Sequence, residues 1–454
     1  QLRLRCESVN GPPECSVGAT NANKGANQGH KRHVIAIAPP CQGPMAGAVC
    51  GQTNRARQGA QGGLVQASRR ISGVVGADGD GWGLFFRARA LAEAGHEITE
   101  LTIGEHDIRT AAPILQAMHA AAMAGHTGYA SIPGTDALRD TIAARVAQQT
   151  GVPTTRANVL VTPGGQSALF AAHHAVLDEG QRALFIDPYY ATYPGTIRAV
   201  GGVPVPVAAA PEDGFQPRGT DIAAAAQGAR SLLINTPNNP TGAVYSADTL
   251  HAIAEAACAH DLWLISDEVY DTQVWQGAHL SPRALPGMAD RTLVVGSLSK
   301  SHAMTGSRLG WVVGPAEMIA LMASLAIHTT YGVPGFIQDA GAFALRQGPA
   351  FEAEIAAPFA RRRQIALDIL QGQNVVRALP PQGAMYIMLD IRATGLNGEA
   401  FGAHMLDHHQ IAVMPGESFG RAAAGHIRVA LTVDDARFAA AFETLVRVAC
   451  ELAA

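Results

Sequence analysis

A lysine follows an apolar run in segment 296–311, which reads GSLSKSHAMTGSRLGW. Lys300 comes two residues after the end of the β-like run 292–298, close to Ser297 and eight residues before Arg308. A buried lysine loses its proton easily, and a neutral amine is a nucleophile that forms imines with carbonyl compounds. The segment therefore predicts an imine-forming amine or, as the structural alternative, a lysine whose ammonium group reaches solvent along a buried stem.

An acidic residue and a pair of asparagines follow two other apolar runs. Asp267 stands in LISDEVY (264–270) after four residues of buried character, where a carboxylate is costly unless a cation or a hydrogen-bond donor meets it. Taken alone, Asp267 could equally cap a helix. In NTPNNPTG (235–242), a rigid turn explains the prolines and the glycine, whereas Asn238 and Asn239 supply amides on a fixed frame. Both runs therefore end in polar groups that a ligand could contact.

Two adjacent glycines stand in VTPGGQSA (161–168), between a predicted strand and a predicted helix. Gly164 and Gly165 allow the backbone to approach a ligand closely, and the start of a helix offers free N–H groups to an anion. A glycine-rich turn with no ligand explains the same residues equally well.

Taken together, these residue types indicate one ligand. In open parallel sheets, ligands bind beyond the carboxyl ends of the strands, where all of these groups fall. Pyridoxal phosphate needs N–H groups, hydroxyls and a guanidinium for its phosphate, a carboxylate for its ring nitrogen and a lysine for its aldehyde. The sequence has neither GxxxxGK[ST] nor a strand-linked GxGxxG, the motifs of other phosphate sites.

The elements that must position these residues form an alternating α/β pattern. Seven strands are expected at 158–164, 183–188, 203–207, 231–237, 262–268, 292–298 and 308–314. Most are continuous apolar runs, which is typical of a largely parallel sheet covered on both faces. The last two strands are too close in sequence for a helical crossover and should pair antiparallel. A helix is expected over 166–180, with Gly180 as its end.

The length of the chain predicts more than one core. A single compact domain stops growing at roughly 250–300 residues, and this chain has 454. Residues 1–65 are basic, lack periodicity and are left unassigned as a disordered or artefactual extension. We expect 66–112 to be the N-terminal part of a small domain, 113–345 a large domain that binds the cofactor, and 346–454 the C-terminal part of the small α+β domain.

Composition excludes several classes of function. The net charge of −4 gives no cationic field for nucleic acid, and no apolar run approaches the roughly 20 residues of a membrane helix. The pairs Cys6–Cys15 and Cys41–Cys50 have eight residues between them, more than zinc ligands usually do, so no metal site is predicted. Only Cys258 and Cys450 lie in the rest of the chain, which favours a reducing, cytoplasmic location.

From about residue 98 to its end, the sequence resembles the class I/II aminotransferases of fold type I, the aspartate aminotransferase-like family. The resemblance rests on LTIGEHD (101–107), YASIPGTDALRDTIA (129–143), VTPGGQSAL (161–169), DPYYATY (187–193), NNPTG (238–242), SDEVY (266–270), SLSKS…GSRLGW (297–311) and PGESFG…HIRVAL (415–431). It implies an α/β fold: a large domain with a mostly parallel seven-stranded sheet between helices, plus a smaller α+β domain. It also implies ping-pong transfer of an amino group between an L-amino acid and a 2-oxo acid, with pyridoxal 5′-phosphate as the cofactor.

The resemblance also implies roles for individual residues. Lys300 would bond to the cofactor aldehyde and then act as the base and acid of the proton shift, Asp267 would pair with the pyridine N–H, and Tyr190 would stack on the ring. Tyr270 and Asn239 would contact the 3′-oxygen. The phosphate would be held by Gly165, Gln166, Ser297 and Arg308, with Ser167 as a neighbouring candidate.

Further roles concern the substrate and the partner subunit. Arg428 would grip the α-carboxylate of the substrate, with Gly104 and Asn239 close to it. Tyr129 would reach the phosphate of the other subunit, so a homodimer is implied. His106 stands where relatives often have proline. The side chain of the substrate stays open; Trp82 and Tyr331 are candidate pocket residues that mildly favour aromatic or aliphatic amino acids.

Two alternatives remain at this point. The same scaffold also supports other reactions of the cofactor, such as β-elimination by a lyase or decarboxylation. Some transcriptional regulators join a DNA-binding segment to an aminotransferase-like body that is not catalytic, and the basic residues 1–65 allow that hypothesis. Residues 1–65 show no helix-turn-helix periodicity, however, so we expect an enzyme that does not bind nucleic acid.

Overall fold

The computed structural model describes residues 66–76 and 81–454. The predicted extension 1–65, with its four cysteines, lies outside the described residues. Residues 65–454 form one compact unit, so the predicted internal boundaries at 112/113 and 345/346 stay predictions. Among the described residues, no helix combines the length and apolar character that a membrane span requires.

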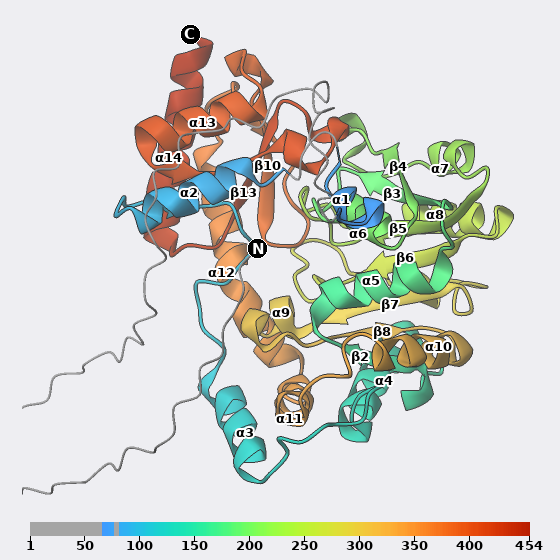
Figure 1. Ribbon diagram of the computed structural model, residues 1–454. Helices are drawn as coiled ribbons and strands as arrows, with labels where there is room; N and C mark the ends of the chain where they lie inside the picture. The colour runs from blue at the N-terminus through green and yellow to red at the C-terminus, as the bar shows by residue number, and fades with distance from the viewer. Residues whose placement is uncertain (1–65, 77–80) are drawn as a thin grey trace, which may run out of the picture. The chain divides into compact units, whose positions relative to one another are not determined.

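A seven-stranded sheet in the order β2-β8-β7-β6-β5-β3-β4 forms the centre of this unit (Figure 1). Its strands are β2 (Val159–Thr162), β3 (Arg182–Asp187), β4 (Val203–Ala208), β5 (Ala229–Asn235), β6 (Trp263–Asp267), β7 (Thr292–Ser297) and β8 (Gly310–Val313). All seven predicted strands are present. Only β8 runs antiparallel to its neighbours, which confirms the mostly parallel sheet and the antiparallel pairing of the last two strands.

Helices cover both faces of this sheet. They are α3 (Ala112–Met123), α4 (Asp136–Thr150), α5 (Gly164–Val176), α6 (Tyr193–Ala199), α7 (Gly219–Ala225), α8 (Ala247–Ala259), α9 (Leu298–Ser301), α10 (Ala316–Ile327) and α11 (Gly335–Leu345). Successive strand residues point to opposite faces. Leu232 therefore packs in the apolar cluster with α8, whereas Leu233 packs in the cluster with α5. The continuous apolar runs in the sequence follow from this burial on both faces.

Helix α5 differs from its predicted bounds of 166–180. It begins at Gly164, and Leu177 already has an extended backbone with its side chain buried. Gly180 lies beyond the helix in a turn, with a φ of 78°. The helix therefore ends at Val176, four residues before the glycine that was predicted to end it.

A second region joins the two ends of the described chain. Its strands are β1 (Thr99–Glu100), β9 (Arg377–Ala378), β10 (Tyr386–Asp390), β11 (Ile411–Ala412), β12 (Met414–Pro415) and β13 (His426–Ala430); its helices are α2 (Gly83–Glu93), α12 (Gly348–Ile369), α13 (Gly398–His409) and α14 (Asp435–Ala453). The short helix α1 (Arg69–Ser72) packs instead beside α6. The sheet β12-β13-β10-β9 is antiparallel, and β1 pairs with β11. Below, the part that follows Leu345 is called the C-terminal region.

Candidate active site

A cavity of about 300 Å³ lies where β5, β6 and β7 end and the C-terminal region begins. It brings together most of the predicted site residues: Gly104, Gly165, Gln166, Tyr190, Asn239, Asp267, Tyr270, Ser297, Lys300, Arg308 and Arg428. Two predicted residues are not among its lining. Ser167 lines a neighbouring, larger cavity, and Tyr129 is 90% exposed on the surface.

Lys300 lies in the single turn of α9, which begins where β7 ends. Ser297 caps this turn, because its Oγ accepts a hydrogen bond from the backbone N–H of Ser299 at 3.1 Å. The Nζ of Lys300 donates to the carbonyl oxygen of Gly104. Burial lowers the pKa of Lys300, and the nearby Glu105 opposes that shift only in part. Burial therefore favours the neutral form of the amine, which is the nucleophilic form.

Asp267 ends β6 with its carboxylate buried in the cavity wall. One oxygen accepts the hydroxyl of Tyr193 at 2.7 Å, and the other accepts the backbone N–H of Val269 at 3.4 Å. Burial raises the pKa of Asp267 to about 6, while the Tyr193 hydrogen bond lowers it. No cation pairs with this carboxylate among the described residues, so it can receive a positively charged N–H from a ligand.

Arg428 lies on β13 with 2% of its surface exposed. Its guanidinium lies between the rings of Tyr386 and Phe419, at 4.3 and 4.4 Å from their centroids. It donates to the Asn239 Oδ1 at 2.8 Å and to the carbonyl oxygen of Thr102. Its Nε is buried without a hydrogen-bond partner, and no acid pairs with it in the described part of the chain. Burial lowers its pKa. Such a group is poised to bind a carboxylate.

Three tyrosines line the remaining wall. The hydroxyls of Tyr270 and Tyr386 are 3.0 Å apart, and burial raises the pKa of Tyr270 well above its ordinary value. Burial also raises the pKa of Tyr190 to about 12. The hydroxyls of Tyr190 and Tyr270 therefore stay protonated at neutral pH and can donate hydrogen bonds.

Gly164 and Arg308 form a tight corner beside the first turn of α5. Gly164 has a φ of 80°, and a Cβ atom built there would overlap the guanidinium of Arg308. Arg308 itself has a φ of 49° and donates to the Thr305 carbonyl oxygen at 2.9 Å. The glycine thus lets a guanidinium lie beside the free N–H groups at the start of α5. This arrangement suits a phosphate.

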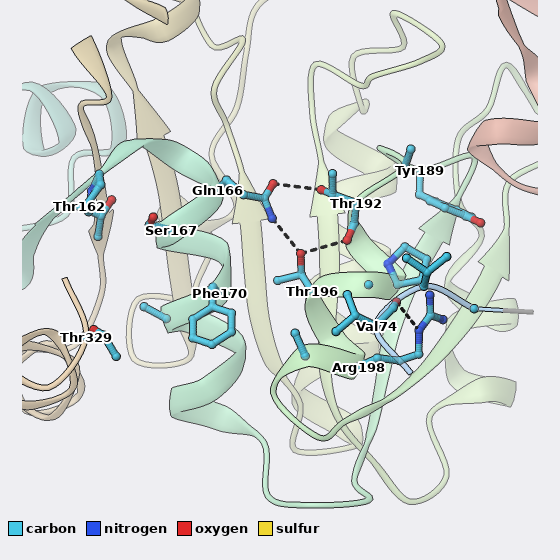
Figure 2. A pocket seen from close by; sticks show the side chains of 18 of the residues that line it. Val74, Thr162, Gln166, Ser167, Phe170, Tyr189, Thr192, Thr196, Arg198 and Thr329 are labelled. Atoms are coloured by element: carbon cyan, nitrogen blue, oxygen red, sulfur yellow. Dashed lines mark hydrogen bonds between the residues drawn. The ribbon is translucent and has the colours of Figure 1, made fainter. Parts of the chain in front are cut away.

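Gln166 lines both the smaller cavity and a larger one of about 840 Å³, which Figure 2 shows. Its amide nitrogen donates to the Thr196 hydroxyl at 2.8 Å, and its amide oxygen accepts from the Thr192 hydroxyl at 3.0 Å. Gln166 and Trp82 line both cavities, whereas Ser167 and Phe170 line only the larger one.

Sequence reasoning missed several contacts of this site. No role was predicted for Tyr193, Tyr386 or Phe419. The partners of Tyr193 and Tyr386 lie 74 and 116 residues away, and the contact of Phe419 with Arg428 depends on the fold of the C-terminal region. One signal was available, however. Lys300 is the only lysine between residues 65 and 454, whereas arginine is used throughout that range. A chain that otherwise uses arginine and keeps one lysine needs that amine for its chemistry.

Comparison with known proteins gives a consistent picture. Residues 96–445 match the family model described as aminotransferase class I and II. The chain is 43% identical over 362 residues to the arginine–pyruvate transaminase AruH of Pseudomonas aeruginosa, covering 79% of this chain and 92% of that protein. Similar solved structures include aspartate aminotransferase from Thermus thermophilus with maleate (TM-score 0.79, 33% identity, 85% of this chain, all of that one). Another is an aromatic aminotransferase from Pyrococcus horikoshii (TM-score 0.76, 32% identity, 80% and 99%).

Proposed function

Because the chain belongs to the class I and II aminotransferases, we propose that Lys300, Asp267 and Arg428 carry the reaction of this family. The enzyme moves an amino group between an amino acid and a 2-oxo acid, and its cofactor is pyridoxal 5′-phosphate. One observation carries the residue assignment. The only lysine of residues 65–454 lines the same small cavity as a buried arginine that has no acidic partner among the described residues.

The donor set of the smaller cavity fits the cofactor. When bound, the cofactor supplies an aldehyde for an amine and a ring that withdraws electrons from the attached carbon. Gly165, Ser297 and Arg308 would hold its phosphate, since Gly164 leaves room for the guanidinium there. Asp267, oriented by Tyr193 at 2.7 Å, would hold the pyridine nitrogen in its protonated form.

Two side chains would hold the 3′-oxygen of the ring. Tyr270 is fixed by the hydroxyl of Tyr386 at 3.0 Å, and the Asn239 Oδ1 is fixed by Arg428 at 2.8 Å. With its oxygen held by Arg428, Asn239 directs its amide nitrogen elsewhere and can donate to the cofactor. Tyr190, which lines the same wall, would cover one face of the ring.

Arg428 and Lys300 would choose which bond of the substrate breaks. The planar guanidinium grips the α-carboxylate and so sets the rotation about the bond to the substrate Cα. The neutral Nζ of Lys300 then accepts the proton that leaves Cα. A carboxylate held by Arg428 would keep the Cα–carboxylate bond out of the orientation in which it breaks, so this arrangement favours deprotonation over the decarboxylase alternative.

For the substrate side chain, we propose a cationic group. The charged residues that line the smaller cavity are Glu105, Asp267, Lys300, Arg308 and Arg428. Every one except Glu105 already has a proposed role. Glu105 is exposed at the edge of the cavity and accepts a hydrogen bond from the hydroxyl of Thr305 at 3.2 Å. A free carboxylate favours a guanidinium or ammonium, and the name of the relative in Pseudomonas aeruginosa supports arginine with pyruvate as the first pair to test.

A half-reaction screen tests the function. Holoenzyme is mixed with single L-amino acids without an oxo acid, and the visible absorbance is followed while a 2-oxo acid is assayed as product. We expect the cofactor band to convert with one 2-oxo acid formed per site, most rapidly with L-arginine. Release of ammonia or CO₂ instead would contradict amino-group transfer. A preference for L-aspartate or L-phenylalanine would contradict the role of Glu105.

We also infer a homodimer. Tyr129 is 90% exposed and Tyr331 is 51% exposed, yet the two rings pack edge to face at 5.0 Å. The larger cavity opens beside them, lined by Phe170 and Leu325 together with Thr330. Large exposed aromatic groups next to an apolar hollow are typical of a protein interface. A second copy of the chain would cover this surface and bring its own Tyr129 toward the phosphate.

Mixing two inactive variants tests this arrangement. K300A lacks the amine, and Y129A lacks the proposed contact with the partner. If each site combines Lys300 of one subunit with Tyr129 of its partner, a hybrid dimer has one intact site. Refolding the two variants together should then restore activity, and sedimentation should show dimers. A mixture as inactive as the separate variants, or a monomer in sedimentation, would contradict the inference.

A cytoplasmic location stays a prediction from the cysteine content.

A further inference from the structure

His106 contacts the backbone of Lys300. Its Nε2 donates a hydrogen bond to the carbonyl oxygen of Lys300 at 2.9 Å, and its ring packs edge to face on Phe359 of α12 at 5.1 Å. The same carbonyl accepts a longer hydrogen bond from the side chain of Gln273 at 3.3 Å. His106 is thus a link between α12 and the residue that carries the amine.

The loop that contains Gly104 and His106 contacts both the side chain and the backbone of Lys300. At the side-chain end, the Nζ donates to the carbonyl oxygen of Gly104; at the backbone end, the carbonyl accepts from His106. Gly104 and His106 are two residues apart, so a shift of one moves the other. The position of Nζ relative to Gly104 therefore depends on the anchor at His106.

The C-terminal region holds this loop from the other side. Arg362 of α12 makes two hydrogen bonds to the carboxylate of Asp107, at 3.0 and 2.6 Å. The hydroxyl of Thr432 donates to the carbonyl oxygen of Ile103 at 3.1 Å. Through these contacts, the loop connects the C-terminal region to Lys300. Within the loop, His106 makes the contact with the backbone of Lys300.

The imidazole of His106 acts as a neutral donor. Burial and, to a smaller extent, the charge of Lys300 lower its pKa to about 4, and Asp107 and Arg362 also face it with opposite effects. Its Nδ1 is buried and has no hydrogen-bond partner in the described part of the chain. A neutral ring with a bare Nδ1 carries its single proton on Nε2, where the carbonyl of Lys300 accepts it. No second positive charge is therefore added beside the amine.

We propose that His106 is a positioning residue, which sets the place and proton affinity of the Lys300 amine through the hydrogen bond to the Lys300 carbonyl. This inference rests on the proposed function of Lys300. The bond holds the backbone of Lys300, from which the side chain carries the reacting amine, and a misplacement of about 1 Å at a reacting atom can cost about 100-fold in rate.

Three substitutions separate the hydrogen bond from the packing. His106→Phe keeps a ring against Phe359 but has no donor, and His106→Gln places an amide nitrogen near the position of Nε2. His106→Asn reaches only as far as Nδ1. The matched control is His251→Phe on α8, which removes a 2.7 Å hydrogen bond from an exposed histidine to the Ala247 carbonyl, away from the cavity.

Two readouts are measured on the full chain. The first is kcat and KM of the holoenzyme. The second is the pKa of Lys300 in the apoenzyme, read by NMR from lysine labelled with ¹³C at Cε. The chain contains only three lysines, so Lys24 and Lys31 serve as internal references. A purely structural role for His106 would change the unfolding midpoint but leave this pKa in place.

We expect His106→Phe to lower kcat by about 10-fold with little change in KM, and to raise the pKa of Lys300 toward its ordinary value as water reaches the amine. His106→Gln should restore both kcat and the pKa of Lys300. His106→Asn should resemble His106→Phe, and the control His251→Phe should resemble wild type. Wild-type values in His106→Phe, or no rescue by glutamine, would overturn the proposal. If His106→Phe does not fold, equal kcat in the glutamine and asparagine variants would overturn it. Failure of wild type to attach the cofactor at Lys300 would instead contradict the proposed function.

Discussion

Two adjoining cavities share Gln166 and Trp82, yet they differ in their charges. The smaller one, of about 300 Å³, is lined by five charged side chains: Glu105, Asp267, Lys300, Arg308 and Arg428. The larger one, of about 840 Å³, is lined by three: Arg198, Glu399 and Glu417. Volume alone would favour the larger cavity as the active site, whereas charge favours the smaller one.

The bonding of these charges explains the difference. In the larger cavity, Arg198 donates to the Val74 carbonyl at 3.0 Å, as Figure 2 shows, and Glu417 accepts the backbone N–H groups of Gly398 and Gly425 at 3.2 and 3.0 Å. In the smaller cavity, Lys300 and Arg428 have no acidic partner within hydrogen-bond distance in the described part of the chain. The charge of Arg428 is buried without an acidic partner, so an anionic ligand would stabilise it.

Lys300→Ala should have the largest effect. It removes the amine that bonds the cofactor and accepts the Cα proton, so we expect the rate of the half-reaction to fall by about 10⁴-fold, the upper range for loss of acid–base catalysis. Arg198→Gln, in the larger cavity, should leave that rate unchanged. Rapid-mixing absorbance measures both. A comparable loss in the two variants would remove the distinction between the cavities.

Arg428→Met should separate stability from function. The buried guanidinium has no acidic partner in the described residues, so an apolar side chain of similar length should raise the free energy of unfolding of the apoenzyme. The same change removes the carboxylate contact, and kcat/KM for the amino acid should fall by about 100-fold or more. Urea unfolding and steady-state kinetics test the two halves. A less stable apoenzyme would show that the arginine serves the fold.

The pH dependence of stability tests the burial of Asp267. Its pKa in the folded state is raised from 3.8 to about 6, so between these values the folded apoenzyme binds a proton more tightly than the unfolded chain does. Its stabilising contribution is therefore present below pH 3.8 and lost as the pH rises through about 6. Asp267→Asn should remove this dependence, which amounts to about 3 kcal/mol at most. Asp187, whose pKa burial also raises to about 6, keeps its own contribution to the pH dependence in that variant.

An equal loss of stability with rising pH in wild type and in Asp267→Asn would contradict this interpretation of Asp267. Cofactor affinity gives the independent check, because the ionised carboxylate is the form that holds the protonated ring. We expect the affinity of wild type for pyridoxal 5′-phosphate to weaken as the pH falls below about 6, and that of Asp267→Asn to be weak throughout.

Thr196→Val should have the smallest effect and tests the wall between the cavities. It removes the 2.8 Å hydrogen bond from Gln166 to the Thr196 hydroxyl without changing the smaller cavity directly. The loss of one such bond is worth about 1 kcal/mol, so the affinity for the cofactor should fall about fivefold. Equilibrium dialysis measures it. A loss as large as that of Asp267→Asn would mean that the larger cavity is part of the cofactor site.

The features predicted best from the sequence are those that depend on where the strands end. The continuous apolar runs located all seven strands, and the polar residues that follow them, such as Asp267 and Lys300, meet in one cavity because parallel strands end at one edge. The sequence could not predict contacts between distant segments. Tyr193 bonds Asp267 across 74 residues, and His106 bonds Lys300 across 194. Arg428 was reached only through the family resemblance, since a lone arginine on a short strand carries no local signal.

The central claim is that the amine of Lys300 binds the cofactor covalently. Reduction of the holoenzyme with borohydride, followed by peptide mass spectrometry, tests it most directly, because the chain has only Lys24, Lys31 and Lys300 as candidates. The mass of the reduced cofactor should appear on the peptide that contains Lys300 and be absent from that peptide without reduction. Finding it on Lys24 or Lys31, or on no lysine at all, would contradict the account.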